Sequence, residues 1–337
     1  MFETYRTSGR FGMLALPLAL IGLVVAIAAS FIYHLALHWI PLIYISFLVT
    51  FGLGIVLGVV GSKIVTIGKV RNVGLAILIG LALTLGALAG KFYFQYQQML
   101  TDTVAIIMED PEADGADPAL IRQALGQELS FAEHIKARVE QGWQIGRPGR
   151  DGGAPISGPF VYVIWLIELG IIAWSAVGLT KSAAGEPFSE KMGEWASEEE
   201  LVMTLPVTSE EMVAQIKAAS SVDDLMEIPI PQTDQSDQFA VYKVNSIEGQ
   251  ELEDAYLSVD LMRLYLDKDG NQKSENTPLV KHAVFTSAQR KQLVENAQLL
   301  NEAMADFREA VDSEAVENAA TDVAEHATDN PNDVADG

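Results

Sequence analysis

The segment PFVYVIWLIELGIIAWSAVGL, residues 159–179, is apolar over 21 residues except for Glu168 near its middle. A helix rises about 1.5 Å per residue, so this segment is long enough to cross a hydrocarbon core of about 30 Å. The sequence therefore predicts a membrane-spanning helix, and Glu168 is the only charged residue in any of the spans predicted below. The segment also separates an apolar first part of the chain from a polar, acidic last part.

Three further apolar segments precede it, at residues 12–33, 40–60 and 73–90. Each has the length of a transmembrane helix. The first exceeds the apolar part of a secretory signal peptide, which is about 7–15 residues, and a second span follows it at once, so we expect it to remain uncleaved. The predicted fold class is a membrane α-helical protein with four transmembrane helices, a small cytoplasmic α+β domain and a disordered acidic tail.

Basic residues in the short loops predict the orientation, because cytoplasmic loops carry an excess of Lys and Arg. Such residues lie before the first span, between the second and third spans, and at Lys181 after the fourth, whereas the loop at residues 34–39 has none. We therefore expect both termini in the cytoplasm and the loop at residues 92–158 on the other side of the membrane.

The bulk composition excludes several function classes. The formal net charge of −23 argues against nucleic acid as a partner, because nucleic-acid binding needs basic patches. The chain has no Cys, which excludes disulfides, thiol catalysis, iron–sulfur clusters and Cys-ligated zinc. We expect no cofactor and no metal site. The predicted partners are the lipid bilayer and an unidentified protein that binds the cytoplasmic domain.

Three segments resemble a group of uncharacterised bacterial multi-pass inner-membrane proteins. They are WIPLIY at residues 39–44, FLVTFG at residues 47–52 and GKVRN at residues 68–72. The resemblance covers the four spans and the residues just after them. It implies a four-span topology in the bacterial inner membrane, and it implies no activity.

A second likeness lies just after the fourth span. PFSEKMGEW at residues 187–195 is similar to the P-F-C-x-x-C-G-x-W frame of zinc knuckles, in which the two Cys form half of a tetrahedral zinc site. Ser189 and Met192 stand at the two ligand positions here, and neither replaces a thiolate. We therefore expect a turn that binds no metal.

Glycine pairs at four-residue spacing occur in two of the spans, at Gly54 and Gly58 and at Gly86 and Gly90. Such pairs let helix backbones approach closely where the hydrophobic effect cannot drive association. Tight packing within one bundle is the first interpretation, and formation of a homo-oligomer is the second.

The predicted external loop has a helical and a turn-rich part. We expect the third helix to extend outward over residues 92–108, and a further helix over residues 118–144, where apolar residues recur at helical spacing. The Gly- and Pro-rich residues 142–158 then return the chain to the membrane. We interpret them as a connector, with a hinge or a ligand-binding loop as the alternative.

The polar region after the fourth span is divided into a linker at residues 180–200, the α+β domain at residues 201–308 and the tail at residues 309–337. The tail has almost no large apolar residue, so burial cannot offset its ordering entropy. Capping boxes at residues 208–211 and 286–289 each follow a short apolar run and predict two helices, an arrangement that fits a weak internal repeat.

Residues 255–266 fit either a strand or a helix. Their alternation changes phase after Leu261, so a strand requires a bulge. We favour the strand, because residues 267–271 form a hairpin-like turn toward the apolar run at residues 279–285. That turn lacks the glycine and the final Glu of an EF-hand, so it predicts no calcium site.

Glu168 is the strongest candidate for a functional residue. A carboxylate in the middle of a span is costly unless it faces another helix or a wet cavity. Counting residues inward from the outer end of each span places Thr50 and Thr84 nearest to the depth of Glu168 in the membrane. The first interpretation is a protonated Glu168 that hydrogen-bonds these hydroxyls, and the second is a proton or cation site.

The leading functional hypothesis is a non-enzymatic scaffold or sensor whose cytoplasmic domain binds another protein. The alternative is a small transporter, or an ion- or proton-conducting protein, that uses Glu168. A membrane enzyme is the least favoured reading, because the His, Asp and Ser residues form no catalytic set in the sequence.

Overall fold

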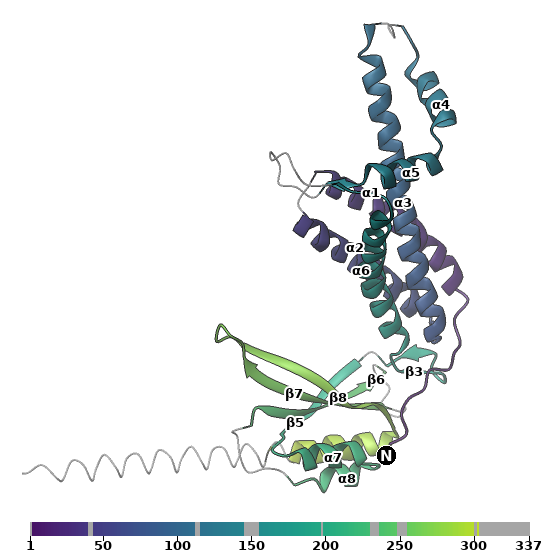
Figure 1. Cartoon of the computed structure of the whole chain (residues 1–337). Helices are drawn as coiled ribbons and strands as arrows, with labels where there is room; N and C mark the ends of the chain where they lie inside the picture. Colours follow the sequence, from purple (N-terminus) through teal and green to yellow (C-terminus); the bar gives the residue numbers. More distant parts are fainter. Residues whose placement is uncertain are drawn as a thin grey trace, which may run out of the picture. The chain divides into compact units, whose positions relative to one another are not determined.

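The computed structural model describes residues 2–39, 43–111, 115–144, 155–196, 198–229, 236–247, 255–299 and 302. They belong to two compact units, which are considered separately here. The helical unit is Thr7–Glu186, and the sheet unit combines Met1–Arg6 with Pro187–Gly337 (Figure 1). The acidic tail predicted at residues 309–337 lies outside the described residues.

Among the described residues, four helices are long and apolar enough to cross a membrane, with mean hydropathies between 2.0 and 2.6. This confirms the four predicted helices and indicates a multi-pass membrane protein. They are α1 (Ala15–Trp39), α2 (Ile43–Ile67), α3 (Val73–Met108) and α6 (Pro159–Ala184).

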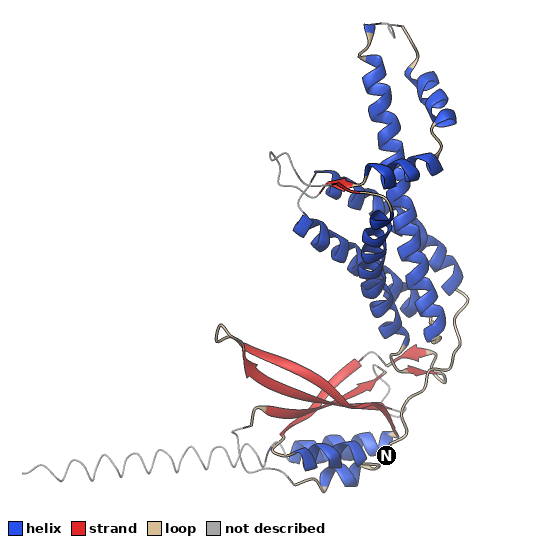
Figure 2. Ribbon diagram, viewed as in Figure 1, coloured by secondary structure: helices blue, strands red, loops and turns tan. Residues whose placement is uncertain are grey.

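The four helices pack as one bundle, in which α2 lies against α6, α1 against α3, and α3 against α6 (Figure 2). The glycine pairs lie at these contacts. A Cβ on Gly58 of α2 would approach Leu179 of α6 to 2.6 Å, and one on Gly90 of α3 would approach Ser30 of α1 to 2.3 Å. The close approach of helices within one bundle therefore uses glycine as expected.

The chain beyond the bundle differs in one respect from the prediction. A single helix was expected over residues 118–144, but α4 (Pro118–Glu128) and α5 (Phe131–Gln141) are separate. Ser130 starts α5 with a complete capping box that includes Glu133, and this new N-terminus interrupts the helix. Two short paired strands, β1 (Trp143–Gln144) and β2 (Pro155–Ile156), then lead to α6.

The sheet unit is built on a four-stranded antiparallel sheet in the order β5-β6-β7-β8. The strands are β5 (Glu198–Pro206), β6 (Gln238–Ser246), β7 (Ala255–Leu266) and β8 (Gln272–Phe285). Helices α7 (Glu210–Ala218) and α8 (Val222–Met226) and a helix at residues 287–299 lie along one side of the sheet (Figure 2). The core between these layers includes the fully buried side chains of Ile216, Leu225, Tyr242, Phe285 and Leu293.

Two predictions for this unit are confirmed. Residues 255–266 are a strand, and its register with β8 shifts on both sides of Val259, before the change of phase that was predicted after Leu261. A capping box between Thr286 and Gln289 starts the last helix. The other predicted box, at residues 208–211, does not start α7: its cap is Ser209, whose side chain accepts from the amide of Met212.

The first residues of the chain belong to the sheet unit, which sequence analysis had not anticipated. The amide of Val284 donates to the carbonyl of Glu3 at 2.7 Å, and the amide of Tyr5 donates to the carbonyl of His282 at 2.8 Å. The ring of Phe2 lies 5.0 Å from that of Phe285 in the core. The N-terminus therefore pairs with β8 as an additional edge segment.

The zinc-knuckle-like sequence forms a hairpin of β3 (Phe188–Ser189) and β4 (Glu194–Trp195). Gly193 takes φ 69°, a left-handed conformation that glycine adopts without strain. The amide of Met192 donates to Ser189 Oγ at 3.3 Å. The predicted turn is thus a hairpin closed by a serine in the position where a knuckle has its first Cys.

Candidate functional site

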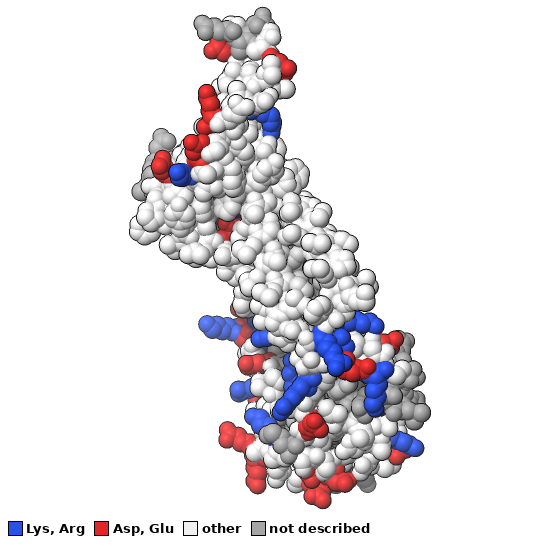
Figure 3. Space-filling model, turned by 90° about the vertical axis from the view of Figure 1, so that its right-hand side faces the viewer, with Lys and Arg blue, Asp and Glu red and all other residues white. Residues whose placement is uncertain are grey.

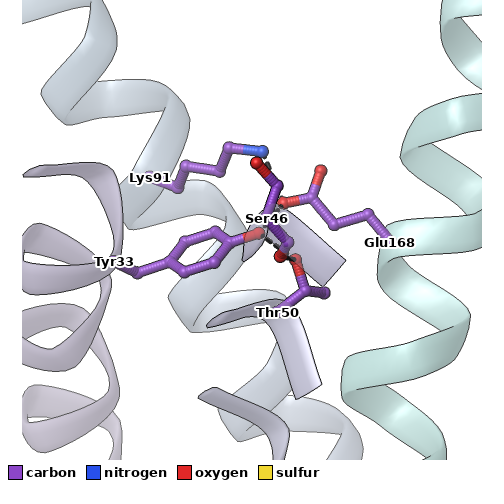
Figure 4. Close-up of polar contacts among 5 residues, drawn as sticks. All are labelled: Tyr33, Ser46, Thr50, Lys91 and Glu168. Carbon is purple, nitrogen blue, oxygen red and sulfur yellow. Dashed lines mark hydrogen bonds and ion pairs between the residues drawn. The ribbon is translucent and has the colours of Figure 1, made fainter. Parts of the chain in front are cut away.

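A polar cluster lies inside the helical unit, at the level of Glu168 (Figure 4). Tyr33 Oη donates to Glu168 Oε1 at 2.6 Å, and Lys91 Nζ donates to the same oxygen at 2.5 Å. The Tyr33 hydroxyl also lies 2.7 Å from Thr50 Oγ1, which in turn donates to the carbonyl of Ser46 at 2.7 Å. One residue from each of the four long helices thus contributes a side chain.

Burial explains why these groups are gathered. The side chain of Lys91 is 6% exposed and that of Glu168 is 12% exposed, so neither charge is solvated by bulk water. A buried charge without a partner is strongly unfavourable, whereas an ion pair with further hydrogen bonds is tolerated. The ammonium of Lys91 also lies 5.5 Å from the ring centre of Tyr33 and 5.3 Å from that of Phe92, close enough for cation–π contacts.

The structure brings together two of the three residues singled out by sequence. Thr50 joins Glu168 through Tyr33, not directly. Thr84 is buried, but its hydroxyl donates to the carbonyl of Gly80 in its own helix at 2.9 Å. This is the common way for a threonine to satisfy its hydroxyl within a helix, and it leaves Thr84 outside the cluster.

Sequence analysis missed Lys91 and Tyr33. Lys91 was excluded because it directly follows the predicted end of the third span, yet α3 continues through it for several turns. Tyr33 was not singled out because it is the last residue of the first predicted span, and aromatic residues are common at the membrane surface. The apolar residues Phe92 and Phe94, which resume just after Lys91, are the signal that the span does not end there.

A second polar group lies seven residues further along α3, about 10 Å toward α4 and α5. His34 Nε2 lies 2.6 Å from Gln98 Oε1, and the Gln98 amide nitrogen lies 3.3 Å from the ring of His38. His34 is buried, whereas this end of α1 becomes exposed at Trp39. The group extends the polar side chains of the bundle from Lys91 toward one end.

An apolar groove of about 440 Å³ lies beside the cluster. Glu168 is the one charged residue among the described residues that line it, which are Leu85, Leu88, Ala89 and Phe92 of α3 and Tyr162, Trp165, Leu166, Glu168 and Leu169 of α6. Phe92 and Trp165 both line the groove, and their rings contact each other edge to face with centres 4.8 Å apart. Glu168 therefore belongs both to the polar cluster and to the lining of this groove.

The described residues contain no group of three or more His, Cys, Asp or Glu side chains arranged to hold a metal ion. Comparison of the chain with protein-family models, with curated proteins and with solved structures found no match.

Proposed function

We propose that this chain is a non-enzymatic sensor or scaffold of the bacterial inner membrane, whose cytoplasmic sheet unit binds another protein. The observation that carries the proposal is the position of the Tyr33–Glu168 hydrogen bond. It joins α1 to α6, and these are the two helices whose ends lead along the chain into the sheet unit. A change at the cluster thus acts on both connections to that unit.

The connections are short. Residues 2–5 pair with β8, and Gly9 already donates its amide to the carbonyl of Arg71 at 3.0 Å in the helical unit. Gly12 makes a similar bond to Gly68 at 2.9 Å. At the other end, only Gly185 and Glu186 separate α6 from Pro187 of the sheet unit. Short connections favour transmission of a helix movement over its loss in a flexible linker.

The distribution of charge supports the proposed orientation. Within the helical unit, Arg10 and Lys181 lie near the ends of α1 and α6 that lead along the chain into the sheet unit. Lys63, Lys69 and Arg71 lie at the connection between α2 and α3, which the segment before α1 contacts through Gly9 and Gly12. Figure 3 shows acidic side chains around the opposite end, where α4 and α5 lie. An excess of basic residues is typical of the cytoplasmic face. Residues 2–5 belong to the sheet unit, as does the chain after α6. Both ends of the four-helix segment are therefore expected on the same side of the membrane.

The projecting end of the β7–β8 hairpin is the proposed partner-binding surface. Strand β6 pairs with β7 only as far as Arg263, whereas β8 pairs with β7 up to Leu266. Tyr265 is 45% exposed and Leu266 is 70% exposed on this two-stranded end. An isolated two-stranded ribbon is marginally stable in water, and exposed apolar side chains on it are typical of an interaction site.

Site-specific photo-cross-linking in native membranes tests this proposal with the full chain. A photoreactive amino acid at Leu266 is expected to give a discrete protein adduct, and Tyr265→Asp is expected to abolish it. The matched control position is Leu299, which is 65% exposed on the last helix. Equal adducts from both positions, or none from either, would overturn the assignment of a partner to the hairpin.

Proton or cation conduction is the second candidate, and the hydrogen-bond donors favour it. The three contacts that link Glu168, Tyr33, Thr50 and the Ser46 carbonyl require three hydrogens, but the two hydroxyls supply only two. A proton on Glu168 Oε1 supplies the third hydrogen. In that arrangement Glu168 donates to Tyr33, Tyr33 donates to Thr50, and Thr50 donates to the carbonyl of Ser46. The same heavy atoms thus accommodate two proton arrangements.

A flux measurement in liposomes decides between the two candidates. Conduction through the cluster predicts that Glu168→Gln reduces proton or cation flux at least tenfold, a change of about 1.4 kcal/mol in the barrier. Flux that is equal in the wild type and the variant excludes the conducting role, and it leaves the sensor proposal in place.

A further inference from the structure

The groove between α3 and α6 has the size and the composition of a ligand site. Its volume of about 440 Å³ falls within the range of about 300–1,000 Å³ that is common for small-molecule pockets. The residues at its rim are exposed on the surface of the bundle, with Leu85 at 57%, Tyr162 at 49% and Leu166 at 64%. In the proposed membrane arrangement, these residues open the groove to the lipid chains.

One hydrogen-bond acceptor is left over at this groove. Tyr33 and Lys91 both donate to Oε1 of Glu168, and no bond joins Oε2 to any described residue. Figure 4 shows this second oxygen directed away from the Tyr33 hydroxyl. Among the described residues that line the groove, Glu168 is the only charged one. A carboxylate oxygen without a donor in an apolar setting is costly, so a donor from a ligand would be favourable.

The charge of the cluster restricts the chemistry of that donor. Glu168 and Lys91 together are neutral, so a cationic ligand would leave an excess positive charge among apolar side chains. An anionic ligand would repel the carboxylate. Glu168 also lies nine residues into α6, about 13 Å from its start, which is deeper than a phospholipid headgroup. A neutral hydroxyl on an apolar chain meets all three conditions.

We propose that the groove binds a lipid-soluble alcohol, a molecule with an apolar chain and one hydroxyl that donates to Glu168 Oε2. The chain lies between residues 85–92 and 162–169, against the rings of Phe92 and Trp165. The inference rests on the membrane insertion in the proposed function, and it does not depend on the protein partner.

Photolabelling of the full chain in phospholipid nanodiscs tests the proposal. The probe is hexadecanol that carries a diazirine, and mass spectrometry locates the adducts. Labelling is expected to concentrate on the two groove segments. Unlabelled hexadecanol is expected to compete roughly three- to tenfold better than hexadecyl methyl ether, because the ether lacks the donor and one hydrogen bond is worth about that much.

Two matched variants separate the groove from general contact with lipid. Ala89 is exposed and lines the groove, so Ala89→Phe fills it and is expected to reduce labelling of both segments about tenfold. Ala82 is exposed on the same helix and does not line the groove, so Ala82→Phe is expected to label like the wild type. Neither variant changes the polar cluster.

Three results would overturn the inference. The first is equal competition by the alcohol and the ether, which indicates apolar contact alone. The second is unchanged labelling of Ala89→Phe. The third is even labelling over all four long helices, which supports insertion but not the groove. Labelling of no helix at all would contradict membrane insertion itself, so failure of the two proposals can be distinguished.

Discussion

The helical unit and the sheet unit differ in the apolar side chains that they expose and in the charge that they bury. The sheet unit places apolar residues such as Ile216 and Phe285 at its centre, with no exposed surface. The helical unit exposes Leu16 and Phe160, each 70%, and buries Lys91 and the hydroxyl of Thr50. The sheet unit is therefore stabilised by the hydrophobic effect, whereas the helical unit depends on close packing and on polar contacts between helices. The same kind of substitution should have different consequences in the two units.

The largest effect is expected from breaking the buried ion pair. Lys91→Met leaves Glu168 without its cation, and loss of one partner of a buried pair costs about 3–5 kcal/mol. Thermal unfolding of the full chain in detergent measures the change. The control is Lys91→Met combined with Glu168→Gln, which removes both charges and is expected to regain most of the loss. A double variant that is as unstable as the single one would show that packing, and not charge, governs this position.

A second pair of variants contrasts an apolar core with an apolar surface. Leu257 of β7 has no exposed area, and Leu257→Ala is expected to destabilise the sheet unit by about 2–5 kcal/mol. Leu78 of α3 is 63% exposed, and Leu78→Ala is expected to change stability by less than about 0.5 kcal/mol. Limited proteolysis with mass spectrometry identifies which unit opens. Equal losses at the two positions would contradict the division between the units.

A smaller effect is expected from glycines in the bundle. Gly58 of α2 faces Leu179, where an added Cβ would lie 2.6 Å from a methyl carbon, so Gly58→Ala is expected to cost about 1–3 kcal/mol through overpacking. Gly52 of the same helix has no atom within 4 Å of an added Cβ. Gly52→Ala should therefore be neutral or slightly stabilising, because alanine favours the helix. Thermal unfolding of both variants tests the contrast, which fails if they have the same melting temperature.

The sequence was a good guide wherever a local pattern carries the information. The four long helices follow from uninterrupted apolar runs, and the strand at residues 255–266 follows from alternation with one change of phase. The turn at residues 187–195 follows from its likeness to a zinc-knuckle frame, and the structure forms it as a hairpin. Glu168 was identified for a physical reason, since a charge in an apolar span requires a partner.

The rest depends on contacts between distant residues. The segment at residues 2–5 has no pattern of a strand, and its pairing with residues 282–284 of β8 bridges nearly the whole chain. Lys91 appeared to end a span because a charge normally does so, but its partner Glu168 is 77 residues away. A burial pattern in one segment does not reveal which helix will supply the opposite charge.

His282 lies in the sheet unit, and its charge can be changed by pH without a mutation. The pKa of His282 is lowered from 6.5 to about 4, mainly by burial and also by the charge of Lys281, while Glu199 opposes the shift. His282 also takes φ 49° at the irregular part of β8, where its carbonyl accepts from Tyr5. A histidine whose pKa is lowered by folding binds fewer protons when folded, so stability is complete above pH 6.5 and falls as the pH drops toward 4.

We expect a loss of about 1 kcal/mol at pH 5 relative to pH 7.5, because partial exposure of the ring reduces the full effect of the shift. Thermal unfolding at several pH values, with proteolysis of the N-terminal segment as a second readout, measures it. His282→Asn is the matched variant, since asparagine tolerates the left-handed backbone and does not titrate in this range. This variant should keep the same stability from pH 7.5 to pH 5, apart from the contribution of other groups. An unchanged pH dependence in His282→Asn would assign the acid sensitivity of the sheet unit to other residues.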